Sequence, residues 1–102
     1  MENIITIIQG DTYECEVTVE GIVAELVDKI YFSSNQLNVC KMLDKRDNKF
    51  ILKFTPEETM KFSTGNLSYD FTIYFLDNTI QTAQYKARIS ILPKINKVQC
   101  NV

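Results

Sequence analysis

A chain of 102 residues with 45% hydrophobic and 24% charged residues is ordinary for one soluble globular domain and leaves no room for several. It contains no histidine, the commonest general base and metal ligand, so most hydrolase constellations are excluded. The net charge of −2 does not favour nucleic acid as a partner, because duplex binding needs a clustered basic face. We therefore expect one domain over residues 1–102, with its core over 3–92 and a tail over 93–102, built for binding or structure rather than catalysis.

The first half of the chain predicts four strands. An apolar segment over 3–8 is followed over 13–19 by alternation of hydrophobic and mostly acidic residues, which is typical of a strand with one solvated face. A third strand over 27–33 places Phe32 on one face and Tyr31 on the other. A fourth, over 37–43, is apolar but does not show which residues face inward, and the charged segment 44–48 after it predicts a turn.

A fifth strand over 49–54 leads into a short helix. Thr55-Pro56-Glu57-Glu58 places a threonine at the helix N-cap, a proline at the first helical position, and Glu58 where its carboxylate can reach back to the Thr55 N–H. We expect one helical turn over 56–61, between the fifth and sixth strands. Met60 or Phe62 should close one end of the core.

The last two strands, over 67–76 and 82–91, predict a hairpin. If odd-numbered residues point inward on both strands, the numbers of paired residues must add to an even number. A three-residue loop Asp77-Asn78-Thr79 satisfies this condition, and Asn78 tolerates the left-handed backbone that such a loop needs. The resulting register pairs Ile73 with Ala83, Phe71 with Tyr85, and Asp70 with Lys86.

Seven short strands separated by turns predict an all-β, seven-stranded antiparallel sandwich, immunoglobulin-like, with a small barrel as the alternative. In that arrangement the strand over 49–54 lies beside the strand over 13–19. The strands over 27–33, 67–76 and 82–91 share the other sheet. The residues expected to point inward are Tyr13, Cys15, Val17, Phe32, Leu52, Phe54, Tyr69, Phe71, Ile73, Tyr85, Ala87 and Ile89.

No group of residues predicts a catalytic, cofactor or metal site. Glu14 and Glu16 share a strand face but should be solvated and paired with Lys49 and Lys53, so neither is set up as a general acid. The acidic residues in the 44–48 turn lack a calcium-loop pattern. Three cysteines without pairwise spacing indicate free thiols, and the scattered glycines form no phosphate loop. We expect no enzyme and no cofactor.

Surface positions are more informative. Tyr31, Tyr74, Leu76 and Ile51 occupy outward positions that are normally polar. Tyrosine is enriched at protein interfaces, where it supplies a large contact area at low entropic cost. Tyr31 and Tyr74 should lie together on one sheet, so these four residues are the candidate interaction surface, although scattered apolar residues on a surface are also ordinary.

The opening Ile8-Gln9-Gly10-Asp11-Thr12 with its alternating strand resembles immunoglobulin-like domains of phage and prophage tail proteins. The resemblance is closest to the N-terminal domain of baseplate upper proteins from phages of Gram-positive bacteria. It continues through the strand over 49–54, the Thr-Pro-Glu-Glu-Thr turn, the alternating segment Tyr69-Asp70-Phe71-Thr72-Ile73 and the turn at Asp77-Asn78, and so covers roughly residues 8–92.

The resemblance implies a non-enzymatic virion component of the tail or baseplate that attaches other virion or phage proteins. A module that binds cell-wall carbohydrate, or an intracellular phage effector that binds a host protein, is the alternative. Self-assembly is also open, because residues 1–28 carry seven acids and no base while residues 78–102 carry four bases and no acid. We expect synthesis in the bacterial cytoplasm without a signal peptide, association with the virion, and neither nucleic acid nor membrane as a partner.

Overall fold

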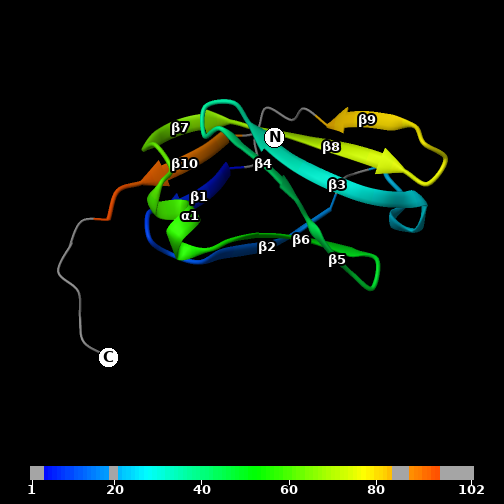
Figure 1. Cartoon of the computed structure of the whole chain (residues 1–102), viewed down its shortest axis with the longest axis horizontal. Coiled ribbons are helices and arrows are strands. Elements are labelled where there is room, and N and C mark those ends of the chain that lie inside the picture. Colours follow the sequence, from blue (N-terminus) through cyan, green and yellow to red (C-terminus); the bar gives the residue numbers. More distant parts are fainter. Residues whose placement is uncertain (1–3, 19–20, 84–87, 95–102) are drawn as a thin grey trace.

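The computed structural model describes residues 4–18, 21–83 and 88–94. Within these ranges the chain forms ten strands, one short α-helix and one 3-10 turn (Figure 1). In chain order the elements are β1 (Ile4–Ile8), β2 (Tyr13–Val17), η1 (Ala24–Leu26), β3 (Val27–Ser34), β4 (Val39–Met42), β5 (Asp44–Arg46), β6 (Lys49–Phe54), α1 (Pro56–Met60), β7 (Gly65–Ser68), β8 (Asp70–Phe75), β9 (Ile80–Ala83) and β10 (Arg88–Leu92). The all-β prediction is confirmed.

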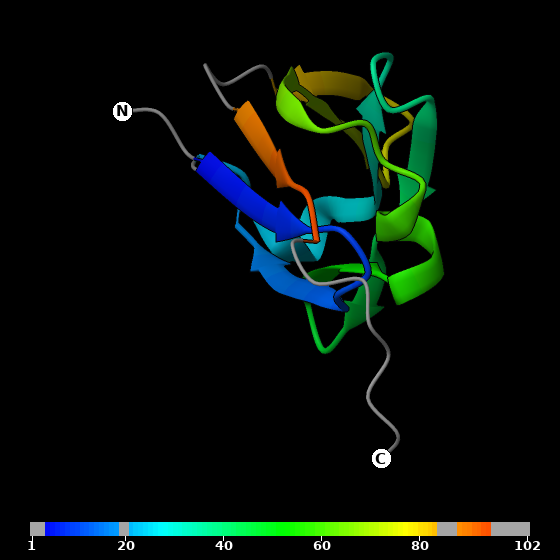
Figure 2. The same ribbon diagram turned by 90° about the vertical axis from the view of Figure 1, so that its left-hand side faces the viewer.

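The strands form three sheets around one core. Their orders are β1-β10-β7, β2-β6-β5 and β4-β3-β8-β9. The last two face each other in a sandwich-like arrangement, since the rings of Phe32 on β3 and Phe54 on β6 meet between them with centroids 5.4 Å apart. In the first sheet β1 and β10 run side by side in the same direction (Figure 2).

Of two pairings expected from the immunoglobulin-like arrangement, the first is confirmed and the second is confirmed in part. β6 lies antiparallel beside β2, with Cys15 opposite Leu52. The predicted strands over 27–33, 67–76 and 82–91 share one sheet only through β3, β8 and β9, since β7 and β10, from the last two of them, lie in the first sheet. The alternation also explains β2, whose Glu14 and Glu16 are exposed as expected.

The predicted count of seven strands is wrong, for two reasons. The segment 67–76 is divided at Tyr69 into β7 and β8, which belong to different sheets, and the last strand is likewise divided into β9 and β10. In addition, part of the predicted turn over 44–48 is a strand, β5. Asp47 and Asn48 both have positive φ, at 48° and 62°, and make a two-residue loop that pairs Arg46 with Lys49. Aspartate and asparagine tolerate this conformation better than most residues, so the turn is shorter than its charged composition indicated.

The predicted hairpin register is two residues off in β8 and β9. Phe71 pairs with Ala83 and Ile73 with Gln81, instead of Tyr85 and Ala83, and the predicted partners Tyr85 and Lys86 lie outside the described residues. The loop has three residues, as expected, but they are Leu76-Asp77-Asn78. Asn78 has a φ of 72°. The left-handed position is the last of such a loop, and the predicted loop would have placed the β-branched Thr79 there.

Further along the same strands the predicted register holds. Leu67 of β7 pairs with Ile89 of β10, the same pair that results when the predicted pairing of Phe71 with Tyr85 is extended along both strands. The two registers differ by two residues because the segments between the paired positions differ in length. Four residues lie between Ala83 and Arg88, but only two lie between their partners Ser68 and Phe71. A shift of two residues preserves which face each side chain occupies, so the inward pattern is the same in both halves.

The core is aromatic at its centre. The ring of Phe32 is fully buried and contacts Phe54, Tyr69 and Phe71 at centroid distances of 5.4, 5.4 and 5.9 Å. Of the residues expected to point inward, the buried ones are Phe32, Leu52, Phe54, Tyr69, Phe71, Ile73 and Ile89. Tyr13, Cys15 and Val17 are partly buried against the core on the edge strand β2, while Tyr85 and Ala87 lie outside the described residues. Burial raises the pKa values of Tyr13 and Tyr69, so both phenols stay neutral.

The predicted helical turn is confirmed as α1, one residue shorter than expected. The Glu58 N–H donates to the Thr55 hydroxyl, and the Thr55 N–H donates to the Glu58 carboxylate at 2.9 Å, which completes the capping box. Phe62, at 4% exposed, closes the core against Phe54, whereas Met60 is 50% exposed.

Thr59 ties this helix to the turn between β1 and β2. Its hydroxyl is fully buried, accepts from the Gly10 N–H at 3.0 Å and donates to the Asp11 carbonyl at 2.8 Å. Gly10 itself has a φ of 87°, and a Cβ there would lie 2.9 Å from the Met60 side chain. The helix therefore anchors the end of the sandwich where β1 leads into β2.

Glu58 makes this helix sensitive to acid. Partial burial of its carboxylate opposes ionisation, but Lys41, 2.7 Å away, and the Thr55 N–H together hold its pKa below the ordinary 4.5. A lowered folded-state pKa gives stability that is present above the unfolded pKa and is lost as the pH falls through the folded one. We expect wild type to melt above Glu58→Gln at neutral pH, and the difference to shrink once the pH falls below 4.5. Thermal melts of both proteins across this range test it, with Glu57→Gln as control; a difference independent of pH would contradict it.

Candidate interaction surface

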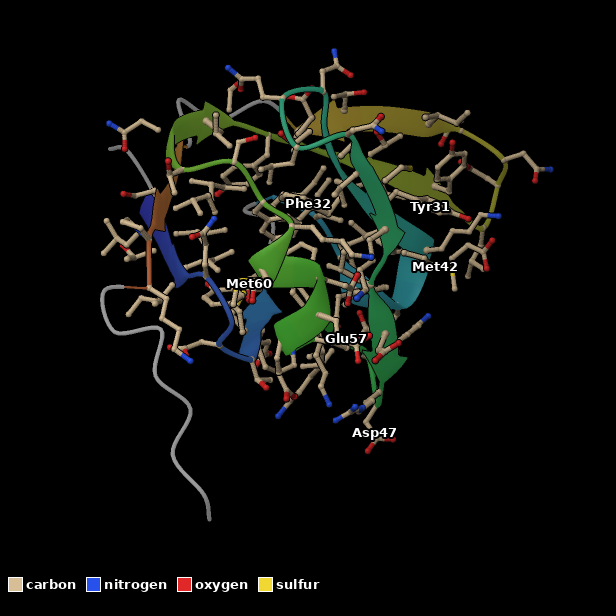
Figure 3. The ribbon with its side chains drawn as sticks, turned by 60° about the vertical axis from the view of Figure 1, so that its left-hand side comes forward. Tyr31, Phe32, Met42, Asp47, Glu57 and Met60 are labelled. Atoms are coloured by element: carbon tan, nitrogen blue, oxygen red, sulfur yellow. The ribbon has the colours of Figure 1, made fainter. Side chains whose placement is uncertain are left out.

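The outer face of the sheet β4-β3-β8-β9 carries an apolar and aromatic row. Directly paired residues of antiparallel strands lie on the same face, because side chains alternate along each strand. Tyr31 pairs with Met42 on one side, and Tyr74 pairs with Lys29 and Ile80. We call Met42, Tyr31, Tyr74 and Ile80 the tyrosine face. In Figure 3, Tyr31 and Met42 project from the same side of the sheet, while Phe32 lies in the interior.

The two tyrosines form one structural unit. Their rings meet edge to face, with centroids 5.6 Å apart and an interplanar angle of 74°. The Lys29 ammonium lies 5.2 Å from the Tyr74 centroid and 5.8 Å from that of Tyr31. Aromatic pairs and cation–π contacts of this geometry restrict the rings, so they stand in a defined orientation before any partner arrives. A partner would therefore meet two fixed rings under one positive charge.

Exposed aliphatic side chains flank this pair. Met42 is 53% exposed beside Tyr31, and Ile80 is 61% exposed beside Tyr74. A partner with an apolar surface could cover all four side chains of the tyrosine face without bending the sheet. The face is polar at its other positions, where Thr72 and Thr82 pair across β8 and β9.

The structure brings together two of the four predicted surface residues. Tyr31 and Tyr74 are in contact, and Leu76, 61% exposed, follows directly in the loop after β8. Ile51 lies elsewhere, on β6 in the other sheet, where it is partly buried between Glu16 and Asp44. It therefore does not belong to the tyrosine face.

Met42 and Ile80 were not predicted. The sequence of the apolar segment 37–43 did not show on which face of the sheet Met42 lies. Only the pairing of Met42 with Tyr31 shows this. Ile80 comes beside Tyr74 because the hairpin register differs by two residues from the expected one. The available signal for Ile80 was its hydrophobic side chain close to a hairpin turn, where polar residues are usual.

Other chemistry-bearing residues form ordinary surface contacts. The Arg46 guanidinium lies 3.9 Å from the Glu14 carboxylate and 3.8 Å from that of Asp44. On the neighbouring strand Glu14 pairs with Lys53, as expected, whereas Glu16 pairs with Ile51 instead of a lysine. Among the described residues no group of histidine, cysteine and carboxylate side chains could hold a metal ion.

Cys15 and Cys40 are free thiols, and Cys100 lies outside the described residues. No helix in the described part of the chain is both long and apolar enough to cross a bilayer.

No protein-family model and no curated protein sequence matches the chain. Among solved structures, the fold is similar to part of a candidate glycoside hydrolase from Bacteroides vulgatus, at 12% identity and a TM-score of 0.43. The similarity covers 88% of this chain and 16% of that one. A likeness this distant carries no argument about activity.

Proposed function

We propose that the protein is a non-enzymatic immunoglobulin-like attachment module, a component of a phage or prophage tail or baseplate, and that the tyrosine face contacts its partner. The immunoglobulin-like assignment is supported by the pairing: β2 beside β6 in one layer, β3, β8 and β9 in the other, and β1 parallel to β10. This is the order expected when a sandwich is built from Greek-key connections. The phage context is supported by the sequence resemblance over residues 8–92.

The tyrosine face is the observation that carries the attachment role. Interfaces are enriched in tyrosine and methionine, and a few aromatic residues usually supply most of the binding energy. Tyr31 and Tyr74 are both partly exposed, lie in contact and are flanked by the exposed Met42 and Ile80. None of these four side chains is needed to close the core, which lies on the opposite face of the same strands.

Particle association tests the role. The wild-type chain, produced in a bacterial strain whose induced phage particles can be purified, should copurify with them at a fixed stoichiometry measured by mass spectrometry. Tyr31→Ala combined with Tyr74→Ala should reduce incorporation at least about tenfold, as expected for the loss of two interface anchors. Thr72→Ala is the matched control, because Thr72 lies on the same face and pairs with Tyr31.

Two results would count against the proposal. Absence of the protein from purified particles would reject the virion role. Incorporation of the double tyrosine variant at the wild-type level, with an unchanged melting temperature, would reject the tyrosine face as the contact. Binding of wild type to isolated cell-wall carbohydrate instead would favour the ligand-binding alternative.

A further inference from the structure

β9 is an edge strand whose first three residues are exposed on both faces. It pairs with β8 on one side, and no described strand lies on its other side (Figure 1). Successive side chains of a strand point to opposite faces, yet Ile80, Gln81 and Thr82 are all exposed. The opposite layer therefore does not cover residues 80–82, and of this strand only Ala83 packs against the core.

The free edge presents a defined set of hydrogen-bonding groups. The Phe75 N–H donates to the Thr79 carbonyl at 2.9 Å, so the Phe75–Thr79 pair is hydrogen-bonded. Bonded and non-bonded pairs alternate along an antiparallel ladder. The Tyr74–Ile80 and Thr72–Thr82 pairs are consequently non-bonded, and the N–H and C=O groups of Ile80 and Thr82 point away from β8.

This edge lacks the protection that the edge strands β5 and β7 have. Natural edge strands are commonly blocked by charges, proline or covering side chains. β5 carries Asp44, Lys45 and Arg46. On β7, the Ser68 N–H donates to the Gln36 side chain and the Ser68 carbonyl accepts from the Ser34 hydroxyl. β9 reads Ile-Gln-Thr-Ala and has neither a charge nor a proline.

We propose that β9 pairs with β9 of a second copy of this chain, antiparallel and about a twofold axis at Gln81. Only in this register do both Ile80 and Thr82 find a partner within the strand: Ile80 faces Thr82 of the second copy, and Thr82 faces its Ile80. Every outward-pointing backbone group of these two residues is then satisfied. Because β9 is uncharged, two copies meet without like charges opposite each other.

A second copy suits this edge better than an unrelated strand, because a twofold contact joins identical patches and closes on itself. It continues β4-β3-β8-β9 into one sheet across both copies, and both tyrosine faces lie on the same side of that sheet. The inference stands apart from the proposed function, since it concerns the edge of the sheet and not its face. The contact is small compared with the roughly 1,200–2,000 Å² of stable complexes, so we expect a dissociation constant above about 10 μM.

Sedimentation across a wide concentration range, together with amide hydrogen exchange, tests the pairing. Wild type should dimerise reversibly, and the Ile80 and Thr82 amides should become protected as concentration rises. Thr82→Pro should weaken dimerisation at least about tenfold, because it removes an edge N–H that the β8–β9 ladder does not use. Thr82→Val keeps that N–H and a branched side chain, so its dissociation constant should stay within about twofold of wild type.

Thr6→Pro is a second control, at an exposed residue of the uncharged edge strand β1. Dimerisation should also change little between low and high salt, unlike contact between an acidic and a basic side. A monomer at every concentration, protection of Ile80 and Thr82 that does not depend on concentration, or a dimer lost with salt or with Thr6→Pro alone would overturn the proposal. The exchange measurement on wild type decides the matter even if Thr82→Pro fails to fold.

Discussion

Phe32→Ala should lower the free energy of unfolding by about 3–5 kcal/mol, the cost of lost burial plus the cavity left behind. The ring is fully buried at the point where the two layers meet, and it contacts three other aromatic rings. Those neighbours are held by their own strands, so they cannot collapse into the space. Small domains have roughly 5–15 kcal/mol of stability in total, and the variant should be marginal.

Thermal and urea unfolding measure this effect. At about 4 °C or more per kcal/mol, the melting temperature should fall by roughly 12 °C or more. Phe75→Ala is the matched control: the same substitution on the same sheet, at a phenylalanine that is only partly buried near the β8–β9 loop. Phe75→Ala should lower the free energy of unfolding clearly less than Phe32→Ala does. Equal losses for the two variants would show that the centre of the core does not lie at Phe32.

Thr59→Val should cost about 1–3 kcal/mol although it preserves the shape of the side chain. Valine removes the hydroxyl that accepts from the Gly10 N–H and donates to the Asp11 carbonyl. The Gly10 N–H, which is partly buried, would then lack its partner, and a donor left unsatisfied in such a place loses part of its solvation free energy.

The hydroxyl can be separated from the shape by a second variant. Thr59→Ser keeps both hydrogen bonds and loses one methyl group, so it should be closer to wild type than Thr59→Val in chemical unfolding. Faster exchange of the Gly10 amide in Thr59→Val would locate the loss at the turn between β1 and β2. If valine were tolerated and serine were not, the contribution of Thr59 would come from its methyl group, and the proposed anchor would be wrong.

Local features of the chain were predictable from the sequence because their causes are local. The capping box at Thr55 and Glu58 depends on residues within one helical turn, and it forms as expected. Asn78 adopts the left-handed conformation in a three-residue loop for the same reason. The alternation around Phe71 and Ile73 identified the buried face of β8, since a period of two assigns faces without knowledge of any partner strand.

Part of the candidate surface was predictable on the same basis. Tyr31 and Tyr74 are outward on strands whose facing the alternation defined, and their strands share a sheet as predicted. Ile51 was grouped with them because its outward position was correct, although its strand belongs to the other layer. Facing alone does not say which sheet a residue belongs to.

Tertiary structure decided the rest, because partner choice and register depend on residues far apart in the chain. Alternation is unchanged when a strand slides by two residues, so it could not choose between Ala83 and Gln81 as the partner of Ile73. That choice places Ile80 beside Tyr74 and completes the tyrosine face. The division of the segment 67–76 at Tyr69 likewise follows from the separate sheets that β7 and β8 join. The sequence by itself determined the inward face of the clearly alternating strands and where the helix begins, whereas contacts across the sheets determined which exposed side chains lie together.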